Sequence, residues 1–415
     1  MDEMIVRPGG PLSGEIPISG AKNSVLKLMV ATVLAPGRFV IRNVPRISDV
    51  DWMAETLVAL GLDVDWSEPQ TLVIDSTGTI TPEAPYRLVE QMRASTALLG
   101  ALLARCGEAR IAMPGGDDFG DRPIDLHLQG LQELGADIEL SHGNIVATTS
   151  GLTGARVVLE YPSVGATENL LLAATRATGI TVIENAAREP EIVDLAAFVN
   201  RMGARVVGAG SSTITITGVD ELHSVEHEVI PDRVEAATYL TILGAARGEV
   251  LLRGARANDL QLLIGKLGEM GMRISPDAAG IWAMASSRPT SVDLATLPYP
   301  GIATDYLPML IALLPMERRL PFTIFISPLQ RRKRPFFPSQ ELKLLWDLAI
   351  RPTDIWRSCR KMSAPPWRRI SPNAAAVPAE SCSLTSRHQR CGNGGGGPPG
   401  ERRYRNWIGN DSRSQ

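Results

Sequence analysis

The sequence predicts an α/β protein built from repeated units of about 70 residues. In four places an apolar helical segment ends at a glycine and an apolar strand follows. These glycines are spaced by 70, 72 and 69 residues: Gly37, Gly107, Gly179 and Gly248. Each unit also contains a second helical segment that ends in a glycine-containing phrase before another strand. Such units are typical of α/β domains whose helices are buried by surrounding sheets.

Within each unit the predicted order is helix, strand, helix, strand, strand. The first helices begin at Ala21, Arg93, Val164 and Arg233. The second helices end in the phrases Ala59–Val64, Glu133–Ile138, Arg201–Val206 and Glu269–Ile274, in which we expect the glycine to follow the helix C-cap.

The starts of the first helices are polar and differ from one unit to the next. A helix start has backbone N–H groups without intrahelical acceptors, and these groups can bind an anion. A solvated scaffold is the alternative interpretation of any repeat. We expect each repeat to contribute its helix start to a shared cleft.

A fifth unit begins at Gly301–Tyr306 and continues into the apolar segment Leu310–Leu314, but the repeat pattern then stops at Pro315. Residues 316–415 contain 19 Lys+Arg and 7 Asp+Glu, a balance of +12, and 11 prolines. The remaining residues therefore contain 42−19 = 23 basic and 45−7 = 38 acidic side chains, a balance of −15. We interpret residues 315–415 as an aberrant basic, proline-rich tail that is frameshifted or disordered.

Composition and targeting signals indicate a cytoplasmic protein. A length of 415 residues predicts two or three domains. The acidic start predicts no signal peptide, and the longest apolar runs, such as Leu98–Ala104, are too short for a membrane span. Four cysteines without paired spacing indicate a reducing compartment, and Cys106 is predicted to be core. No Cys/His cluster predicts a metal, and His127 and His142 are interpreted as structural or surface residues.

The loop Pro114–Pro123 is the strongest single candidate for a ligand-binding segment. Its adjacent glycines, Gly115 and Gly116, permit positive φ and a close approach to a ligand. Arg122 can bind a phosphate or carboxylate with two hydrogen bonds, and Asp117 can transfer a proton beside it. The alternative is a surface turn with scattered charges.

Residues 1–314 closely resemble the UDP-N-acetylglucosamine 1-carboxyvinyltransferases, also called UDP-N-acetylglucosamine enolpyruvyl transferases. The motifs that support the resemblance are Ser19–Asn23, Met92–Ser95, Pro114–His127, Ser163–Thr167, Ile183–Ile192, Ile230–Arg233 and Thr304–Asp305. The resemblance implies transfer of the enolpyruvyl group of phosphoenolpyruvate to the 3′-hydroxyl of UDP-N-acetylglucosamine, with release of phosphate. This is the first committed step of peptidoglycan synthesis, on which cell shape and division depend.

The resemblance also implies the enolpyruvyl transferase fold, with two inside-out α/β barrel domains. Residues 21–230 would form the first domain, and residues 1–20 with 231–314 an incomplete second domain. The substrates would bind between them without cofactor or metal. The related 3-phosphoshikimate enolpyruvyl transferases share this fold, but the Ile183–Ile192 phrase and the Gly-Gly loop favour the UDP-sugar enzyme.

The match assigns roles residue by residue. Asp305 matches the proposed base for the sugar hydroxyl, with a helix N-cap as the alternative interpretation. Lys22 matches a contact to phosphoenolpyruvate and Asn23 its sugar-binding neighbour. Arg93 and Arg122 match the anion-binding arginines. The uracil end would contact Pro123, Asp125 and Leu126, and the diphosphate side Ser163, Val164 and Gly165. Asp232 and Arg233 fall at the domain crossover.

Two departures from the family affect function. Asp117 stands where many members have a cysteine that takes part in proton transfer and is alkylated by the epoxide fosfomycin, so we expect fosfomycin resistance. Family members also have a sixth repeat whose arginines bind phosphoenolpyruvate, and residues 316–415 do not match it. We therefore expect poor solubility and little turnover, and a non-catalytic UDP-sugar-binding remnant is the alternative function.

A nucleic-acid partner is the third interpretation. The basic run Arg331–Arg334 suits a nucleic-acid patch, but such runs are weak evidence, so we predict no nucleic-acid partner.

Overall fold

The computed structural model describes residues 9–113, 124–313 and 324–326. All of them belong to one compact unit that ends at Ser358. The predicted site residues Asp117, Arg122 and Pro123 lie outside the described residues, as does the tail apart from residues 324–326.

The described residues form the following elements. The first strand and the first unit are β1 (Leu12–Pro17), α1 (Lys22–Ala31), η1 (Thr32–Leu34), β2 (Arg38–Arg42), α2 (Ser48–Ala59), β3 (Asp63–Glu68) and β4 (Thr71–Asp75). The second unit comprises β5 (Glu83–Ala84), α3 (Tyr86–Val89), η2 (Arg93–Ala97), α4 (Leu98–Cys106), β6 (Glu108–Ala112), α5 (Asp125–Glu133), β7 (Asp137–Ser141) and β8 (Asn144–Thr148).

The third unit comprises β9 (Arg156–Val158), α6 (Val164–Ala174), β10 (Ile180–Glu184), α7 (Pro190–Arg201), β11 (Arg205–Val207), β12 (Thr213–Thr217) and β13 (Glu226–Glu228). The fourth comprises α8 (Arg233–Ala246), β14 (Gly248–Arg253), η3 (Ala257–Leu260), α9 (Gln261–Glu269), β15 (Arg273–Asp277) and β16 (Gly280–Ala285). The fifth begins with β17 (Leu294–Thr296), η4 (Thr304–Tyr306) and α10 (Leu307–Leu313), and β18 (Ile324–Ile326) follows.

The predicted α/β repeat is confirmed in all four units, and glycine conformation explains its regularity. The glycines after the second helices have positive φ, a region that favours glycine. Their φ angles are 101°, 92°, 110° and 100°: Gly61, Gly135, Gly203 and Gly271. The glycines before the first strands have φ of 133°, 76°, 96° and 119°: Gly37, Gly107, Gly179 and Gly248.

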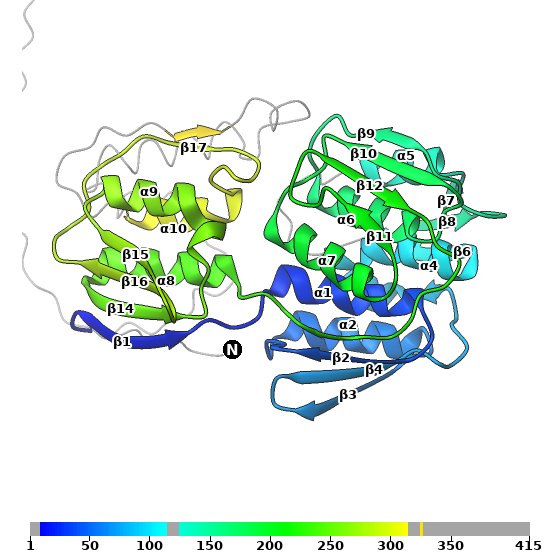
Figure 1. Cartoon of the computed structure of the whole chain (residues 1–415), viewed down its shortest axis with the longest axis horizontal. Coiled ribbons are helices and arrows are strands. Elements are labelled where there is room, and N and C mark those ends of the chain that lie inside the picture. The colour runs from blue at the N-terminus through cyan, green and yellow to red at the C-terminus, as the bar shows by residue number, and fades with distance from the viewer. Residues whose placement is uncertain (1–8, 114–123, 314–323, 327–415) are drawn as a thin grey trace, which may run out of the picture. The chain divides into compact units, whose positions relative to one another are not determined.

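Four sheets share one topology, but two of them exchange a strand. Their orders are β13-β2-β4-β3, β5-β6-β8-β7, β9-β10-β12-β11 and β1-β14-β16-β15. In each, an outer strand pairs in parallel with the first strand of a unit. β5 and β9 directly precede the unit that they join, whereas β1 pairs with the fourth unit and β13 with the first. Figure 1 shows the dark blue β1 beside β14.

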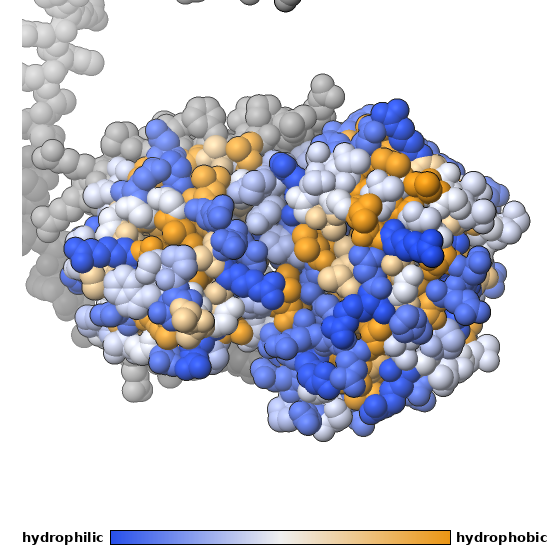
Figure 2. All heavy atoms as spheres, viewed as in Figure 1, coloured by the Kyte–Doolittle hydropathy of each residue, from blue (hydrophilic) through white to orange (hydrophobic). Residues whose placement is uncertain are grey.

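The buried residues form two hydrophobic cores. The first runs from Ala21 to Ile230, and within it every residue of α6 from Ala166 to Ala174 is buried. The second combines Ile18 with residues between Ala236 and Leu313. Its helix α8 is less covered than α6, since Ile242 is 44% exposed. On the face shown in Figure 2, apolar and hydrophilic residues lie interspersed.

The chain crosses between the two cores twice, and the two crossings pair with each other. Gly20 and Pro231 form an antiparallel bridge. Ala21 N–H donates to the Ile230 carbonyl at 2.7 Å, and Asp232 N–H donates to the Ser19 carbonyl at 2.8 Å. A Cβ on Gly20 would lie 1.7 Å from the carbonyl oxygen of Asn43, so only glycine fits there.

One sequence expectation, the core position of Cys106, is wrong, and the interpretation of residues 315–415 as a frameshifted or disordered tail stays a prediction. Within these residues β18 pairs in parallel with β17, as the other outer strands pair with their units. Its sequence, Ile-Phe-Ile, is β-branched and aromatic, a composition that favours a strand. Cys106 is exposed rather than core, because it is the last residue of α4, where the helix leaves the buried region. Helices of sufficient length and apolar character to cross a membrane do not occur in the described ranges.

Two glycine substitutions test this account of the crossing. Gly20→Ala forces the backbone away from Asn43 and should lower the free energy of unfolding by roughly 1–3 kcal/mol. The control is Gly265→Ala inside α9, where no atom lies within 4 Å of the added Cβ. It should stabilise by about 0.5–1 kcal/mol, because alanine favours a helix interior. Urea unfolding followed by circular dichroism measures both, and equal effects of the two substitutions would contradict the argument.

Candidate functional site

A cavity of about 1000 Å³ lies where the helix starts of all five units meet. The described residues that line it include the starts of α1, η2, α6, α8 and η4: Lys22, Asn23, Arg93, Ser163, Val164, Gly165, Arg233, Thr304 and Asp305. The predicted shared cleft is therefore observed. Lys22 N–H at the start of α1, and Val234 and Glu235 N–H at the start of α8, donate to the Asp232 carboxylate. The first N–H groups of α6 can interact with an anionic ligand.

Lys22, the first residue of α1, forms an exposed ion pair that an anionic ligand can replace. Its Nζ lies 2.7 Å from Asp49 Oδ2, and the two side chains are 50% and 24% exposed. Ion pairs this exposed contribute about 0–1 kcal/mol. An anionic ligand can therefore replace Asp49 at little cost.

A second lysine, Lys27, is held in a buried pair. Its Nζ lies 2.9 Å from Glu168 Oε2 of α6, and Glu168 is 1% exposed. Burial raises the pKa of Glu168, and the Lys27 ammonium opposes that shift. Removing one partner of such a pair leaves a buried charge uncompensated. We therefore assign Lys27 to the structure of the cavity floor rather than to ligand binding.

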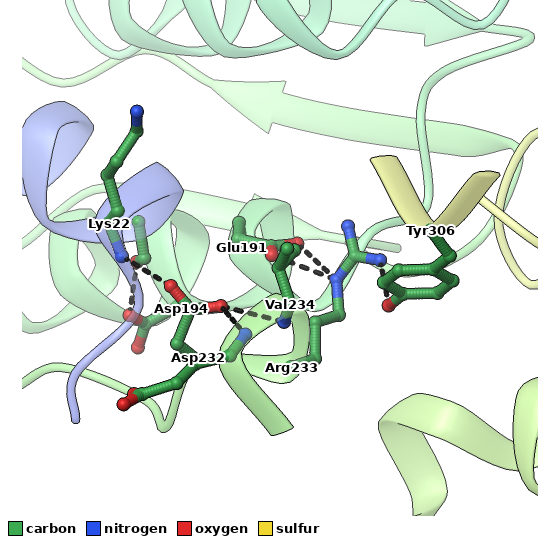
Figure 3. Close-up of polar contacts among 9 residues, drawn as sticks. Lys22, Glu191, Asp194, Asp232, Arg233, Val234 and Tyr306 are labelled. Atoms are coloured by element: carbon green, nitrogen blue, oxygen red, sulfur yellow. Dashed lines mark hydrogen bonds and ion pairs between the residues drawn. The ribbon is translucent and has the colours of Figure 1, made fainter. Parts of the chain in front are cut away.

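Arg233, the first residue of α8, joins three units beside Asp305. Its Nε donates to Glu191 Oε1 of α7 at 2.9 Å, and its Nη1 donates to the Tyr306 hydroxyl at 2.9 Å (Figure 3). Burial opposes the charge, but Glu191 and Tyr306 raise the pKa of Arg233 overall. Burial raises the pKa of Tyr306 to about 12. Because Tyr306 follows Asp305 directly, the network fixes the segment that presents Asp305 to the cavity.

Glu189 is a second acidic side chain with altered titration. It lines the cavity, and its buried Oε2 has no hydrogen-bond partner among the described residues. Burial raises the pKa of Glu189, the Arg233 charge lowers it, and the Glu191 charge raises it further. The side chain is therefore closer to neutrality than an exposed glutamate.

The structure places the predicted site residues as follows. Those that line the cavity together are Lys22, Asn23, Arg93, Ser163, Val164, Gly165 and Asp305. Asp125 and Leu126, the first residues of α5, do not line it. The N-cap alternative for Asp305 is wrong, because Ala303 occupies the N-cap of η4.

Sequence reasoning missed His127 as a cavity residue. Its imidazole lines the cavity although the residue is only 6% exposed. Burial, together with the charges of Arg93 and Lys27, lowers the pKa of His127 to about 4. Its place directly after Asp125 and Leu126 was the available signal. His142 is exposed in the turn between β7 and β8, so its interpretation as a surface residue is confirmed.

The described cavity residues do not supply a surplus of positive charge. Four are basic: Lys22, Lys27, Arg93 and Arg233. Six are acidic: Asp49, Glu90, Glu168, Glu189, Glu191 and Asp305. The formal balance is 4−6 = −2, and Lys22, Lys27 and Arg233 form ion pairs with acidic residues of the same cavity. No group of side chains suited to a metal ion occurs among the described residues.

Comparison with known proteins gives a consistent result. A model of the EPSP synthase (3-phosphoshikimate 1-carboxyvinyltransferase) family matches residues 6–317. UDP-N-acetylglucosamine 1-carboxyvinyltransferase 1 from Staphylococcus aureus strains N315 and MW2 is 46% identical over 319 residues, which span 76% of this chain and 75% of that protein.

Two solved structures share the fold. The enolpyruvyl transferase NikO from Streptomyces tendae superposes with a TM-score of 0.67 at 23% identity, over 77% of this chain and 76% of that chain. An EPSP synthase from Acinetobacter baumannii superposes with a TM-score of 0.61 at 17% identity, over 82% of this chain and 78% of that chain.

The neutral state of buried His127 predicts a pH-dependent stability. Its pKa is 6.5 when unperturbed and about 4 in the fold. Between these values the unfolded chain binds a proton that the folded chain does not bind. The contribution of neutral His127 to the free energy of unfolding is therefore fully present above pH 6.5. It is lost as the pH falls toward 4, by about 1.4 kcal/mol per pH unit. The free energy of unfolding of the wild type and of His127→Gln, measured from pH 7 to pH 4, checks this prediction. If both fell equally with pH, the assignment to His127 would be contradicted.

Proposed function

Because this chain belongs to the EPSP synthase family of enolpyruvyl transferases, we propose that it acts on phosphoenolpyruvate and UDP-N-acetylglucosamine. The sugar 3′-oxygen forms a bond to C2 of phosphoenolpyruvate, its proton passes to a base, and C3 gains a proton. The adduct then loses a proton from C3 as the C2–O bond to phosphate breaks. The products are the enolpyruvyl ether and inorganic phosphate.

The convergence of five helix starts on one cavity is the observation that best supports this proposal. Asp305, exposed at the cavity, accepts the proton of the sugar hydroxyl. Lys22 exchanges Asp49 for the phosphoenolpyruvate anion, and Asn23 contacts the sugar. Arg93 and the α6 start bind the anionic groups of the nucleotide sugar.

Roles for the residues from Asp117 to Leu126 follow from the family resemblance alone. Arg122 binds an anionic group, and the uracil contacts Pro123 together with Asp125 and Leu126, which begin α5 outside the described cavity lining. Asp117 protonates C3. Such an enzyme works in the cytoplasm at an early step of peptidoglycan synthesis, and thereby supports cell shape and division.

The UDP-sugar is preferred over shikimate 3-phosphate as acceptor. The relatives named for UDP-N-acetylglucosamine are 46% identical, whereas the EPSP synthase structure is 17% identical. An identity of 17% supports a shared fold but does not indicate which substrate is bound.

Binding of the UDP-sugar without transfer is the second candidate. It is favoured by the end of the family match at residue 317 and by the formal charge of −2 among the described cavity residues. A trianionic co-substrate needs additional cations. Arg122 and the residues after 317 lie outside this count, and we expect additional cations from them.

Turnover separates these two candidates. The purified chain is given both substrates, and released phosphate is measured. Asp305→Asn should lower kcat by about 10²–10⁴-fold, as expected for the loss of a general base, with UDP-N-acetylglucosamine binding retained. The control, Asp220→Asn, alters an exposed carboxylate outside the cavity lining and should change neither quantity. Binding by the wild type without phosphate release would favour the second candidate, and equal turnover by Asp305→Asn would exclude its role as base.

Reaction with fosfomycin tests the role of Asp117. A carboxylate is a far weaker nucleophile toward an epoxide than a thiolate, so the wild type should resist time-dependent inactivation. Asp117→Cys should become sensitive and remain active, because a thiol also transfers protons, whereas Asp117→Ala should lose most activity. If the variant chains lack turnover, mass spectrometry of the covalent adduct gives the same comparison. An adduct on Asp117 itself would contradict the prediction.

A further inference from the structure

We propose that His127 is a ligand-binding residue, which donates a hydrogen bond from Nε2 to a phosphoryl oxygen bound at the start of α6. Asn169 determines which ring nitrogen bears the proton. The inference rests on the proposed function in one respect, that the phosphoryl group belongs to the nucleotide sugar.

The tautomer of His127 follows from a chain of three hydrogen bonds. Gly100 N–H is a donor, and it lies 2.6 Å from Asn169 Oδ1, which fixes the orientation of the Asn169 amide. Asn169 Nδ2 then donates to the Thr96 carbonyl at 3.1 Å and to His127 Nδ1 at 3.1 Å. A nitrogen that accepts a hydrogen bond bears no proton. Neutral His127 is therefore protonated at Nε2.

Gly100 and Asn169 are themselves confined by packing. A Cβ on Gly100 would lie 2.2 Å from the Asn169 carbonyl oxygen, so α4 and α6 touch through backbone at this point. Asn169 is fully buried, and its amide cannot turn over without losing its hydrogen bonds to Gly100 N–H and to the Thr96 carbonyl. The hydrogen bond from Asn169 that determines the His127 tautomer therefore lies within the first hydrophobic core.

The protonated Nε2 is directed at the start of α6. A Cβ on Gly165 would lie 3.1 Å from His127 Nε2 and 2.9 Å from Cε1, so the ring lies against the helix start. The hydrogen bond of the ring to Asn169 uses Nδ1, and His127 lines the cavity although the residue is only 6% exposed. The Nε2–H donor can therefore be given to a ligand oxygen in the cavity.

The chemistry of the surroundings selects a phosphoryl oxygen. Val164 and Gly165 are the first residues of α6, an 11-residue helix, so their N–H groups have no intrahelical acceptor. Ser163 Oγ already accepts from Ala166 N–H. The His127 ring thus adds an N–H donor beside two backbone donors at the start of α6, a set that suits an anionic oxygen. The charged groups around the ring are Arg93, Lys27 and Asp125.

Calorimetry at pH 7.5 with the full chain tests the assignment, with UDP and uridine as probes. His127→Phe should weaken UDP binding by about 10–100-fold, as expected for the loss of a hydrogen bond to a charged group. The affinity of His127→Phe for uridine, which lacks phosphate, should change less than about twofold, which is the usual effect of a surface substitution. His127→Gln, which retains a donor, should recover part of the loss, and the control His223→Phe, at an exposed histidine, should have no effect.

The ring nitrogens give a second measurement that needs no variant. ¹⁵N NMR of the wild type at pH 7.5 should show His127 protonated at Nε2 alone. The proposal would be overturned by a proton on Nδ1. It would also be overturned if His127→Phe lost equal affinity for UDP and uridine, or if its affinity for UDP were unchanged. It would be overturned likewise if the wild type failed to bind UDP.

The outcome is distinguishable from that of the proposed function. UDP binding that depends on His127, without phosphate release from both substrates, would retain the assignment and exclude transfer by this chain. Phosphate release with unchanged UDP affinity in His127→Phe would retain transfer and exclude the role of His127.

Discussion

The carboxylate of Asp232 joins the starts of two helices that are 210 residues apart in the sequence. It accepts from Lys22 N–H at 3.0 Å at the start of α1, and from Val234 N–H at 2.7 Å and Glu235 N–H at 3.1 Å at the start of α8. Hydrogen bonds to a charged group are worth about 1.5–3 kcal/mol each. The exchange of β1 and β13 between sheets brings these segments together, and Asp232 then fixes both helix starts against the cavity (Figure 3).

Burial separates the ion pairs of the cavity into two kinds. The pair of Lys22 and Asp49 is exposed and exchangeable, whereas those of Lys27 with Glu168 and of Arg233 with Glu191 are buried. A buried pair contributes little net stability, but losing one partner is costly. Lys27 and Arg233 therefore maintain the shape of the cavity, and Lys22 is a cation whose present partner is easily replaced.

The repeat was predictable from the sequence because positive φ restricts its turns to glycine, and those positions recur in each unit. The convergence of helix starts was likewise predictable from their polarity. The role of His127 was not, because its partners follow from contacts between α4, α5 and α6 across 42 and 69 residues of chain. Nor was β18, since three apolar residues in a proline-rich segment give no periodic signal. Cys106 was misplaced because helix composition does not show where the last turn leaves the core.

A neutral donor at the α6 start suits the charge balance of the cavity. The charges of Arg93 and Lys27, together with burial, keep His127 uncharged, so the site presents N–H dipoles rather than another cation. Dipoles fixed in the core need no reorganisation when an anion arrives. They also leave unchanged the ion pairs that shape the cavity. In the proposed function, α6 and its core neighbours, all before residue 231, bind the nucleotide, and Lys22 binds the co-substrate together with cations outside the described residues.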